Sequence, residues 1–237
     1  MADDFDLEGL AAYLHMELTK VRRMAERGKV PGRRQNGGWR FNAAEIHHWL
    51  EARIADADTQ EATRIEGALT RDQESASDEG ITIEALLDPH AIAVPLMART
   101  KAAVINGMCE LAAGTGMLWD PDRMADAVRQ REEMFPTAIE GGMALLHPRR
   151  PMESILGGPM LAVGQTTRGI PFGCPSGGLT DLFFLILSVN DRQHLRTLAR
   201  LGRILGMAGT VDELRDAETP EDLRAVFIAK ETGLRDC

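Results

Sequence analysis

At the start of the chain, apolar residues recur at helical spacing and then give way to a polar turn signal. A stripe at 7–14 follows Asp6, whose carboxylate can cap a helix. A second stripe at 18–25 stops at Gly28, a residue type common just after a helix. The dipeptide at 36–37 is Asn-Gly, a strong signal for a tight hairpin. This order predicts two helices and a two-stranded wing, which together are typical of a winged helix-turn-helix domain.

A polar, acidic stretch separates this domain from the rest of the chain. Asn42 can cap a last helix, so we expect the first domain to cover residues 1–54. Residues 55–80 hold 2 Lys and Arg against 8 Asp and Glu, with few large apolar side chains. Such a composition is typical of a self-repelling tether, although an extension of the preceding helix is also open. In either form it is a linker to a larger domain at 81–237.

The larger domain alternates between apolar runs and amphipathic segments. The pattern predicts helices at 101–113, from 120 to about 133, at 191–205 and from 219, and strands near 91–94, 143–146, 160–164 and 179–188, with a loop or short strand at 168–173. The run at 182–187 is apolar throughout, as a strand buried on both faces should be. Strands interleaved with helices predict an α/β sandwich, a mixed sheet flanked by helices.

Charge, hydropathy and cysteine content exclude several classes of protein. The net charge of −9 argues against indiscriminate coating of nucleic acid, and no apolar run is long enough to span a membrane. The acidic N-terminus lacks the features of a signal peptide, so we expect a cytoplasmic protein. The odd number of cysteines, 3, and their wide spacing indicate free thiols. No ligand spacing supports a zinc site, and the sequence calls for neither a metal nor another cofactor.

One histidine has surroundings that suggest chemistry. His147 follows the apolar run 143–146, and Pro148 should end the strand pairing there. Arg149 and Arg150 follow at once, and a neutral imidazole beside fixed positive charge is a plausible nucleophile for a phosphoryl group. A histidine at a strand end is also common as a surface or structural residue. A second histidine, His194, falls in the first turn of a predicted helix, where backbone N–H groups favour anions.

Basic residues gather in the first domain. Eight of them and a single acid lie between Lys20 and Arg40, as phosphate contact requires, although a solvated helix face is the simpler reading of a basic run. The segments 10–14, 21–32, 38–41 and 45–50 resemble the excisionase and MerR-like winged helix-turn-helix family, and the likeness covers nearly all of residues 6–52. That resemblance implies DNA as a partner and a recognition helix and wing that carry Thr19, Lys20, Arg22, Arg23, Arg34 and Arg40.

The second domain resembles the enzyme IIA domain of the fructose–mannitol class of the bacterial phosphotransferase system, including its nitrogen-regulatory branch. The segments that carry this resemblance are 86–89, 101–105, 131–133, 137–147, 169–173, 182–186 and 194–201. The resemblance implies that His147 accepts a phosphoryl group from the phosphohistidine of a small phosphocarrier protein. It implies that His194 is the second active-site histidine and that Arg150 lies nearest to the family's downstream arginine. Lys101 is interpreted as a solvated helix residue.

The chain departs from this family beside the candidate acceptor. The family usually has proline before the histidine and glycine after it, whereas Leu146 and Pro148 stand here. Pro148 has no backbone N–H to offer a phosphoryl oxygen. This departure keeps open an enzyme IIA-like domain that acts only as a sensor or dimerisation scaffold.

Together these features predict a bacterial regulator in which phosphorylation of a histidine is coupled to DNA binding. Another alternative is a sugar-transport phosphocarrier whose N-terminal domain binds protein. Because helix-turn-helix modules commonly bind paired half-sites, we expect a homodimer.

Overall fold

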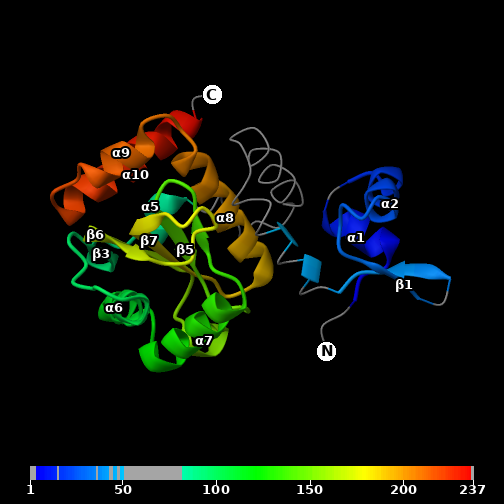
Figure 1. Ribbon diagram of the computed structural model, residues 1–237, viewed down its shortest axis with the longest axis horizontal. Helices are drawn as coiled ribbons and strands as arrows, with labels where there is room; N and C mark the ends of the chain where they lie inside the picture. Colours follow the sequence, from blue (N-terminus) through cyan, green and yellow to red (C-terminus); the bar gives the residue numbers. More distant parts are fainter. Residues whose placement is uncertain are drawn as a thin grey trace.

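The computed structural model describes residues 4–14, 16–35, 37–42, 45–46, 49–50 and 82–235. The predicted linker at 55–80 and Cys237 lie outside these residues, so the predicted domain boundaries stay predictions. Figure 1 shows the two described parts of the chain, which are treated separately below.

The N-terminal part has the predicted helices and hairpin. They are α1 (Leu7–Tyr13), α2 (Leu18–Glu26), β1 (Arg33–Gln35) and β2 (Gly38–Arg40). Asp6 caps α1 by accepting a hydrogen bond of 2.7 Å from the Gly9 N–H, and Gly28 follows α2 with φ +65°. Asn42 accepts from the Glu45 N–H at 3.2 Å, which confirms the cap predicted for the last helix.

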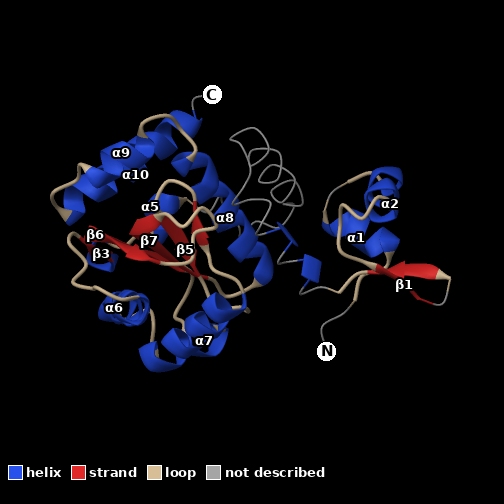
Figure 2. Ribbon diagram, in the orientation of Figure 1, coloured by secondary structure: helices blue, strands red, loops and turns tan. Residues whose placement is uncertain are grey.

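Residues 82–235 fold into helices and one mixed sheet. The helices are α5 (Ile83–Leu86), α6 (Lys101–Gly114), α7 (Pro121–Met134), α8 (Asp191–Leu205), α9 (Thr210–Arg215) and α10 (Pro220–Arg235). The strands are β3 (Ile92–Ala93), β4 (Ala138–Ile139), β5 (Met143–Leu146), β6 (Met160–Pro171) and β7 (Leu179–Leu187), and 3₁₀ turns lie at Pro89–Ala91 and Glu153–Ile155. Figure 2 shows the strands as a layer between helices.

In this part of the chain the five strands are ordered β3-β6-β7-β5-β4. β3 pairs parallel with β6 and β5 with β7, whereas β6 pairs antiparallel with β7 and β4 with β5. The predicted mixed sheet is therefore confirmed. The predicted loop or short strand at 168–173 is largely the end of β6, which passes a register irregularity between Gln165 and Ile170.

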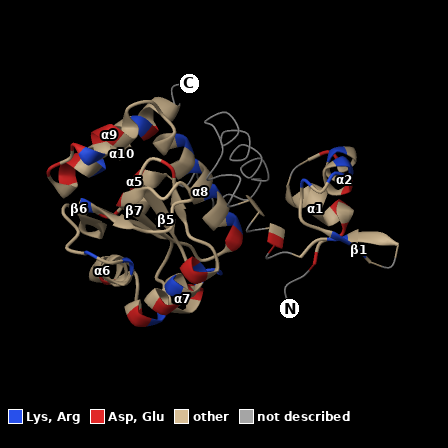
Figure 3. Cartoon of the chain, in the orientation of Figure 1, with Lys and Arg blue, Asp and Glu red and all other residues tan. Residues whose placement is uncertain are grey.

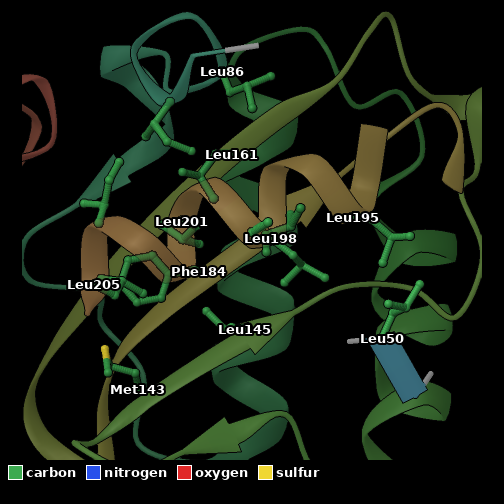
Figure 4. Close-up of a cluster of buried hydrophobic side chains, with 14 of the residues drawn as sticks. Leu50, Leu86, Met143, Leu145, Leu161, Phe184, Leu195, Leu198, Leu201 and Leu205 are labelled. Atoms are coloured by element: carbon green, nitrogen blue, oxygen red, sulfur yellow. The ribbon is translucent and has the colours of Figure 1, made fainter. Parts of the chain in front are cut away.

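The apolar side chains of the sheet form two layers, because successive residues of a strand point to opposite faces. One layer joins the sheet to α8 and α10, and Figure 4 shows Leu198 and Leu201 of α8 close to Phe184 of β7. The other layer joins the opposite face to α6 and α7 through residues such as Met108 and Val128. The domain is thus an α/β sandwich.

The last helix is tied to the first one of this domain. Glu231 of α10 is 2% exposed, and its two carboxylate oxygens accept hydrogen bonds from the N–H groups of Ile83 (2.8 Å) and Glu84 (3.0 Å) at the start of α5. Arg200 of α8 lies 3.7 Å from the same carboxylate. Glu231 therefore connects α5, α8 and α10 at the point where the chain enters the domain.

Candidate functional site

His147 lies at the carboxyl edge of two parallel strands. β5 and β7 pair in parallel with Leu146 beside Leu185, so both strands end at the same edge of the sheet. His147 follows β5 directly, and a short turn leads from the end of β7 into α8. In open α/β sheets, carboxyl edges of this kind are the usual place for ligands and chemistry.

The two histidines face one another at this edge. Met143 and Leu145 point into the layer beneath α8, so the alternation of β5 sends His147 to the same side. His194 lies in the first turn of α8, which Asn190 caps by accepting from the Gln193 N–H at 2.9 Å. The two imidazole rings have centroids 4.7 Å apart and planes tilted by 50°. The structure thus brings together two residues that are far apart in sequence.

The imidazole of His147 has a defined tautomer. Its Nδ1 lies 2.8 Å from the carbonyl oxygen of Leu145. A carbonyl oxygen can only accept a hydrogen bond, so Nδ1 carries the proton and the lone pair of the neutral ring lies on Nε2. His147 is 3% exposed and His194 is 5% exposed. The nitrogen available as a nucleophile is therefore Nε2.

Positive charge lies near this edge in two different settings. Arg149 and Arg150 are exposed on the loop that follows His147. Arg131, at the end of α7, is only 7% exposed and donates to the Phe135 carbonyl at 2.6 Å. β4 pairs with β5 so that Thr137 lies beside Leu145, and Phe135 lies two residues before Thr137. This places the Arg131 guanidinium next to the segment that leads into β4, the strand beside β5.

Arg131 is a candidate site residue that sequence reasoning did not select. It lies seven residues after Met124 and three after Val128, so it continues the buried stripe of α7. A charged residue on a buried stripe was the available signal.

The interpretation of Lys101 as a solvated residue is wrong. Its Nζ lies 2.8 Å from Oε2 of Glu132, whose side chain is 1% exposed, and 4.7 Å from the centroid of the Phe172 ring. The reason is that the first turn of α6 lies against the end of α7, so the long side chain reaches inward rather than outward.

The residues predicted to contact DNA are all on the surface. Thr19, Lys20, Arg22 and Arg23 are exposed on α2, whose opposite side buries Val21 and Ala25. In the wing, Arg34 and Arg40 are exposed, and the Arg34 guanidinium lies 5.4 Å from the centroid of the Trp39 ring. Figure 3 shows Lys and Arg on α2 and at β1. The helix and the wing thus present several cations without burying any of them.

The part of the chain that the structure describes contains neither a cluster of metal ligands nor a membrane-spanning helix. In these residues, no cluster of three His, Cys, Asp or Glu side chains could hold a metal ion. None of the described helices has the length and apolar character that a membrane span needs.

The fold and the histidine pair define a class: an α/β sandwich with two facing histidines at a carboxyl edge, preceded by a small helix-turn-helix. Residues 85–230, more than half of the chain, match the family described as "Phosphoenolpyruvate-dependent sugar phosphotransferase system, EIIA 2". Residues 5–54 match a helix-turn-helix domain. The chain belongs to the EIIA type 2 family and carries a helix-turn-helix domain at its N-terminal side, which confirms the resemblances found in the sequence.

Individual relatives are distant. A nitrogen regulatory protein of Pseudomonas aeruginosa is 26% identical over 155 residues, which are 65% of this chain and 99% of that protein. The fructose-specific EIIABC component of Bacillus subtilis is 27% identical over 141 residues, 59% of this chain. The match spans only 22% of that longer protein.

Solved structures agree on the fold. The nitrogen regulatory protein IIA-Ntr of Neisseria meningitidis has a TM-score of 0.55 and 20% identity, covering 61% of this chain and 98% of that one. Enzyme IIA of the mannitol system of Escherichia coli, solved in complex with phosphorylated enzyme IIB, has a TM-score of 0.52 and 17% identity, covering 61% and 99%. At these identities the likeness concerns the fold alone.

Proposed function

We propose that the chain accepts a phosphoryl group on Nε2 of His147 and that the phosphorylated domain changes how the helix-turn-helix domain binds DNA. The observation that carries the proposal is the pair of facing histidines in which one ring has its lone pair fixed on Nε2. The donor we infer is a phosphohistidine on a small phosphocarrier protein. The domains would be residues 1–54, a linker at 55–80 and residues 81–237.

The transfer needs no metal and no net proton movement. The Nε2 lone pair forms a new P–N bond while the P–N bond of the donor breaks, and the donor imidazole leaves with that electron pair. Because Nδ1 keeps its proton, the phosphorylated His147 ring becomes cationic, and the Leu145 carbonyl stabilises that charge. Phosphoryl transfer depends mainly on in-line positioning and on charge around the equatorial oxygens.

The neighbouring groups have distinct roles in this proposal. His194, in the first turn of α8, hydrogen-bonds the phosphoryl group, and the N-terminal end of that helix favours the added negative charge. Arg150 supplies positive charge from the solvent side, and Arg131 supplies it from the buried side. The two arginines thereby offset the N–H that Pro148 does not provide.

The test is an intact-mass assay on the full chain with phosphoenolpyruvate, the first enzyme of the system and the phosphocarrier protein. We expect an acid-labile gain of one phosphoryl group in the wild type and no gain in His147→Ala. His90→Ala is a matched control, because the His90 side chain is 85% exposed and pairs with Asp88 within its own turn. It should be phosphorylated like the wild type. Phosphorylation of His147→Ala would refute the site. An inert wild type, with both partners active on a control acceptor, would favour a scaffold without transfer activity.

The DNA half is tested by salt-dependent binding to duplex DNA. If Lys20 and Arg23 each neutralise one phosphate, replacing either by Ala should reduce the slope of log affinity against log salt by about 0.9. Arg99→Ala, an exposed basic residue of the second domain, should leave the slope unchanged. The coupling is measured by comparing the affinity of the phosphorylated and unphosphorylated forms for the same duplex. Equal affinities would refute the coupling and leave a DNA-binding domain whose affinity is independent of phosphorylation.

A further inference from the structure

A buried carboxylate lies next to the candidate site but takes no part in the chemistry proposed above. Glu132 is 2% exposed, at the end of α7. Its Oε2 pairs with Lys101 at 2.8 Å, and its Oε1 accepts hydrogen bonds from the N–H of Thr137 at 3.1 Å and from the Thr137 hydroxyl. A charge this deeply buried is costly unless it is paired and hydrogen-bonded, and here both oxygens are engaged.

Lys101 is held in an electrostatically poor position. It is the first residue of α6, where the helix dipole disfavours a cation. Its ammonium is nevertheless fixed by Glu132, by the Phe172 carbonyl at 3.4 Å and by the face of the Phe172 ring. The unfavourable position of this cation at the start of α6 is therefore offset by its pairing with Glu132, whose other oxygen reaches Thr137.

Thr137 and Leu145 lie opposite one another at the end of the β4–β5 ladder. Residues in a hydrogen-bonded antiparallel pair normally exchange two N–H···O bonds. Here the Leu145 N–H donates to the Thr137 carbonyl at 3.2 Å, but the Thr137 N–H donates to Glu132. The Leu145 carbonyl instead accepts from Nδ1 of His147 at 2.8 Å.

We propose that Glu132, supported by Lys101, is a positioning residue that draws the Thr137 N–H away from Leu145 and so leaves the Leu145 carbonyl to hold the Nδ1–H tautomer of His147. This assignment rests on the proposed function only in its consequence for phosphoryl transfer. The tautomer itself is a property of the unphosphorylated protein. Without an acceptor at position 132, the Thr137 N–H turns to the Leu145 carbonyl and shares that oxygen with Nδ1, which weakens the preference for the Nδ1–H tautomer.

Two double variants isolate the acceptor from the ion pair. Lys101→Met with Glu132→Gln removes both charges and keeps an oxygen for Thr137. Lys101→Met with Glu132→Leu removes both charges and the oxygen as well. Buried ion pairs often tolerate replacement by apolar groups of similar volume. The two variants therefore differ chiefly in whether the Thr137 N–H has an acceptor.

The measurement is ¹⁵N NMR of histidine-labelled full chain, with the His147 signals identified by their loss in His147→Ala. We expect protonated Nδ1 and unprotonated Nε2 at neutral pH in the wild type and in the Gln variant, and mixed tautomers in the Leu variant. The rate of phosphoryl uptake should fall roughly tenfold in the Leu variant relative to the Gln variant, as expected when a group that orients a histidine is lost.

Asp181→Asn is the structural control. Asp181 pairs with Arg215 at 2.9 and 2.8 Å, and Arg215 also donates to the Gly141 carbonyl, so this pair supports the turn end of the same β4–β5 hairpin. Its loss should destabilise the hairpin and leave the His147 tautomer unchanged. A shift in this control as large as in the Leu variant would overturn the proposal, as would an unchanged tautomer in the Leu variant.

The wild-type spectrum can overturn the proposal even if a variant fails to fold. A His147 protonated on Nε2 and not on Nδ1 would overturn the proposal directly. A wild type that has the expected tautomer but takes up no phosphoryl group would refute the proposed function while leaving the role of Glu132 measurable.

Discussion

At the scale of single residues, the histidines of this chain differ in what their surroundings allow. The His90 side chain is 85% exposed and pairs with Asp88 beside it, so its contacts are local and open to water. His147 is buried, with one nitrogen committed to a main-chain carbonyl. Burial and a hydrogen bond to the main chain convert a common side chain into one with a predetermined reactive atom.

Burial has the opposite effect on Cys109, because it makes the thiol unreactive. Burial raises the pKa of its thiol from 9.0 to about 12. We expect no reaction of Cys109 with a maleimide at pH 8 in the folded chain and full reaction in denaturant, as read by mass spectrometry. Labelling of native Cys109 at that pH would contradict the buried placement.

The same shift predicts a dependence of stability on pH. The folded thiol keeps its proton when the unfolded thiol has lost it, so the contribution is complete below about pH 9 and declines as pH rises toward 12. The decline attributable to Cys109 is at most about 1.4 kcal/mol per pH unit. Urea unfolding between pH 8 and 10.5 should therefore show a shallower fall in Cys109→Ala than in the wild type.

At the scale of elements, the turn between β4 and β5 depends on a glycine. Gly142 has φ +78°, and a Cβ there would lie 2.6 Å from Nη2 of Arg215 and 3.0 Å from Oδ1 of Asp181. A hydrogen bond from Arg215 to Asp181 also raises the pKa of the guanidinium, so the pair resists displacement. We expect Gly142→Ala to lower the free energy of unfolding by roughly 2–4 kcal/mol, from left-handed strain and from displacement of the ion pair.

Gly177→Ala is the matched control for that prediction. Gly177 has φ +77°, and no described atom lies within 4 Å of the point where a Cβ would stand. Its substitution should cost only the conformational term, about 1–2 kcal/mol. Equal losses in the two variants by urea unfolding would show that the Arg215–Asp181 pair adds nothing at Gly142.

The long helices of the second domain are among the elements that the sequence predicted. The helices α6, α7, α8 and α10 span 14 to 16 residues, enough for an apolar stripe to repeat several times. The strand β4, with 2 residues, and the helix α5, with 4, show no period at all, and neither was predicted. Their positions are set by partners far away in the chain, such as Glu231 for α5.

The residues of the candidate site also fall into those that the sequence could select and those that it could not. His147 and His194 could be selected because each follows an apolar run, where strands end. The contact between the two histidines depends on the parallel pairing of β5 and β7, which cannot be predicted from the sequence around either residue. Arg131, Glu132 and Lys101 were missed because the burial of the first two and the ion pair of Glu132 with Lys101 depend on how the end of α7 meets β4 and α6, a matter of tertiary packing.

At the scale of the whole molecule, Glu231 of α10 links the last helix of the second domain to α5 and α8. We expect Glu231→Ala to lower the free energy of unfolding by roughly 2–4 kcal/mol, because two backbone N–H groups and Arg200 lose a buried acceptor. Lys230→Ala is the adjacent control. Lys230 pairs with Glu213 at a site that is 49% exposed on the glutamate side, so its loss should cost at most about 1 kcal/mol.

Denaturant unfolding of both variants checks this prediction. A loss in Glu231→Ala no larger than that in Lys230→Ala would mean that water replaces the carboxylate at the start of α5. The alternative variant Glu231→Gln keeps an oxygen acceptor and should fall between the two.

Glu231 also has a consequence for the order in which the protein is made. It lies 148 residues after Ile83, so the N–H groups of Ile83 and Glu84 receive this carboxylate only when the ribosome has synthesised most of α10. At roughly 5–20 residues per second, that interval is on the order of ten seconds. The helix-turn-helix has left the ribosome and can fold during that time, while the proposed phosphoryl-accepting domain is still incomplete. Every nascent chain therefore passes through a period in which the first domain is present without the second, and a translation product truncated before Glu231 stays in that condition.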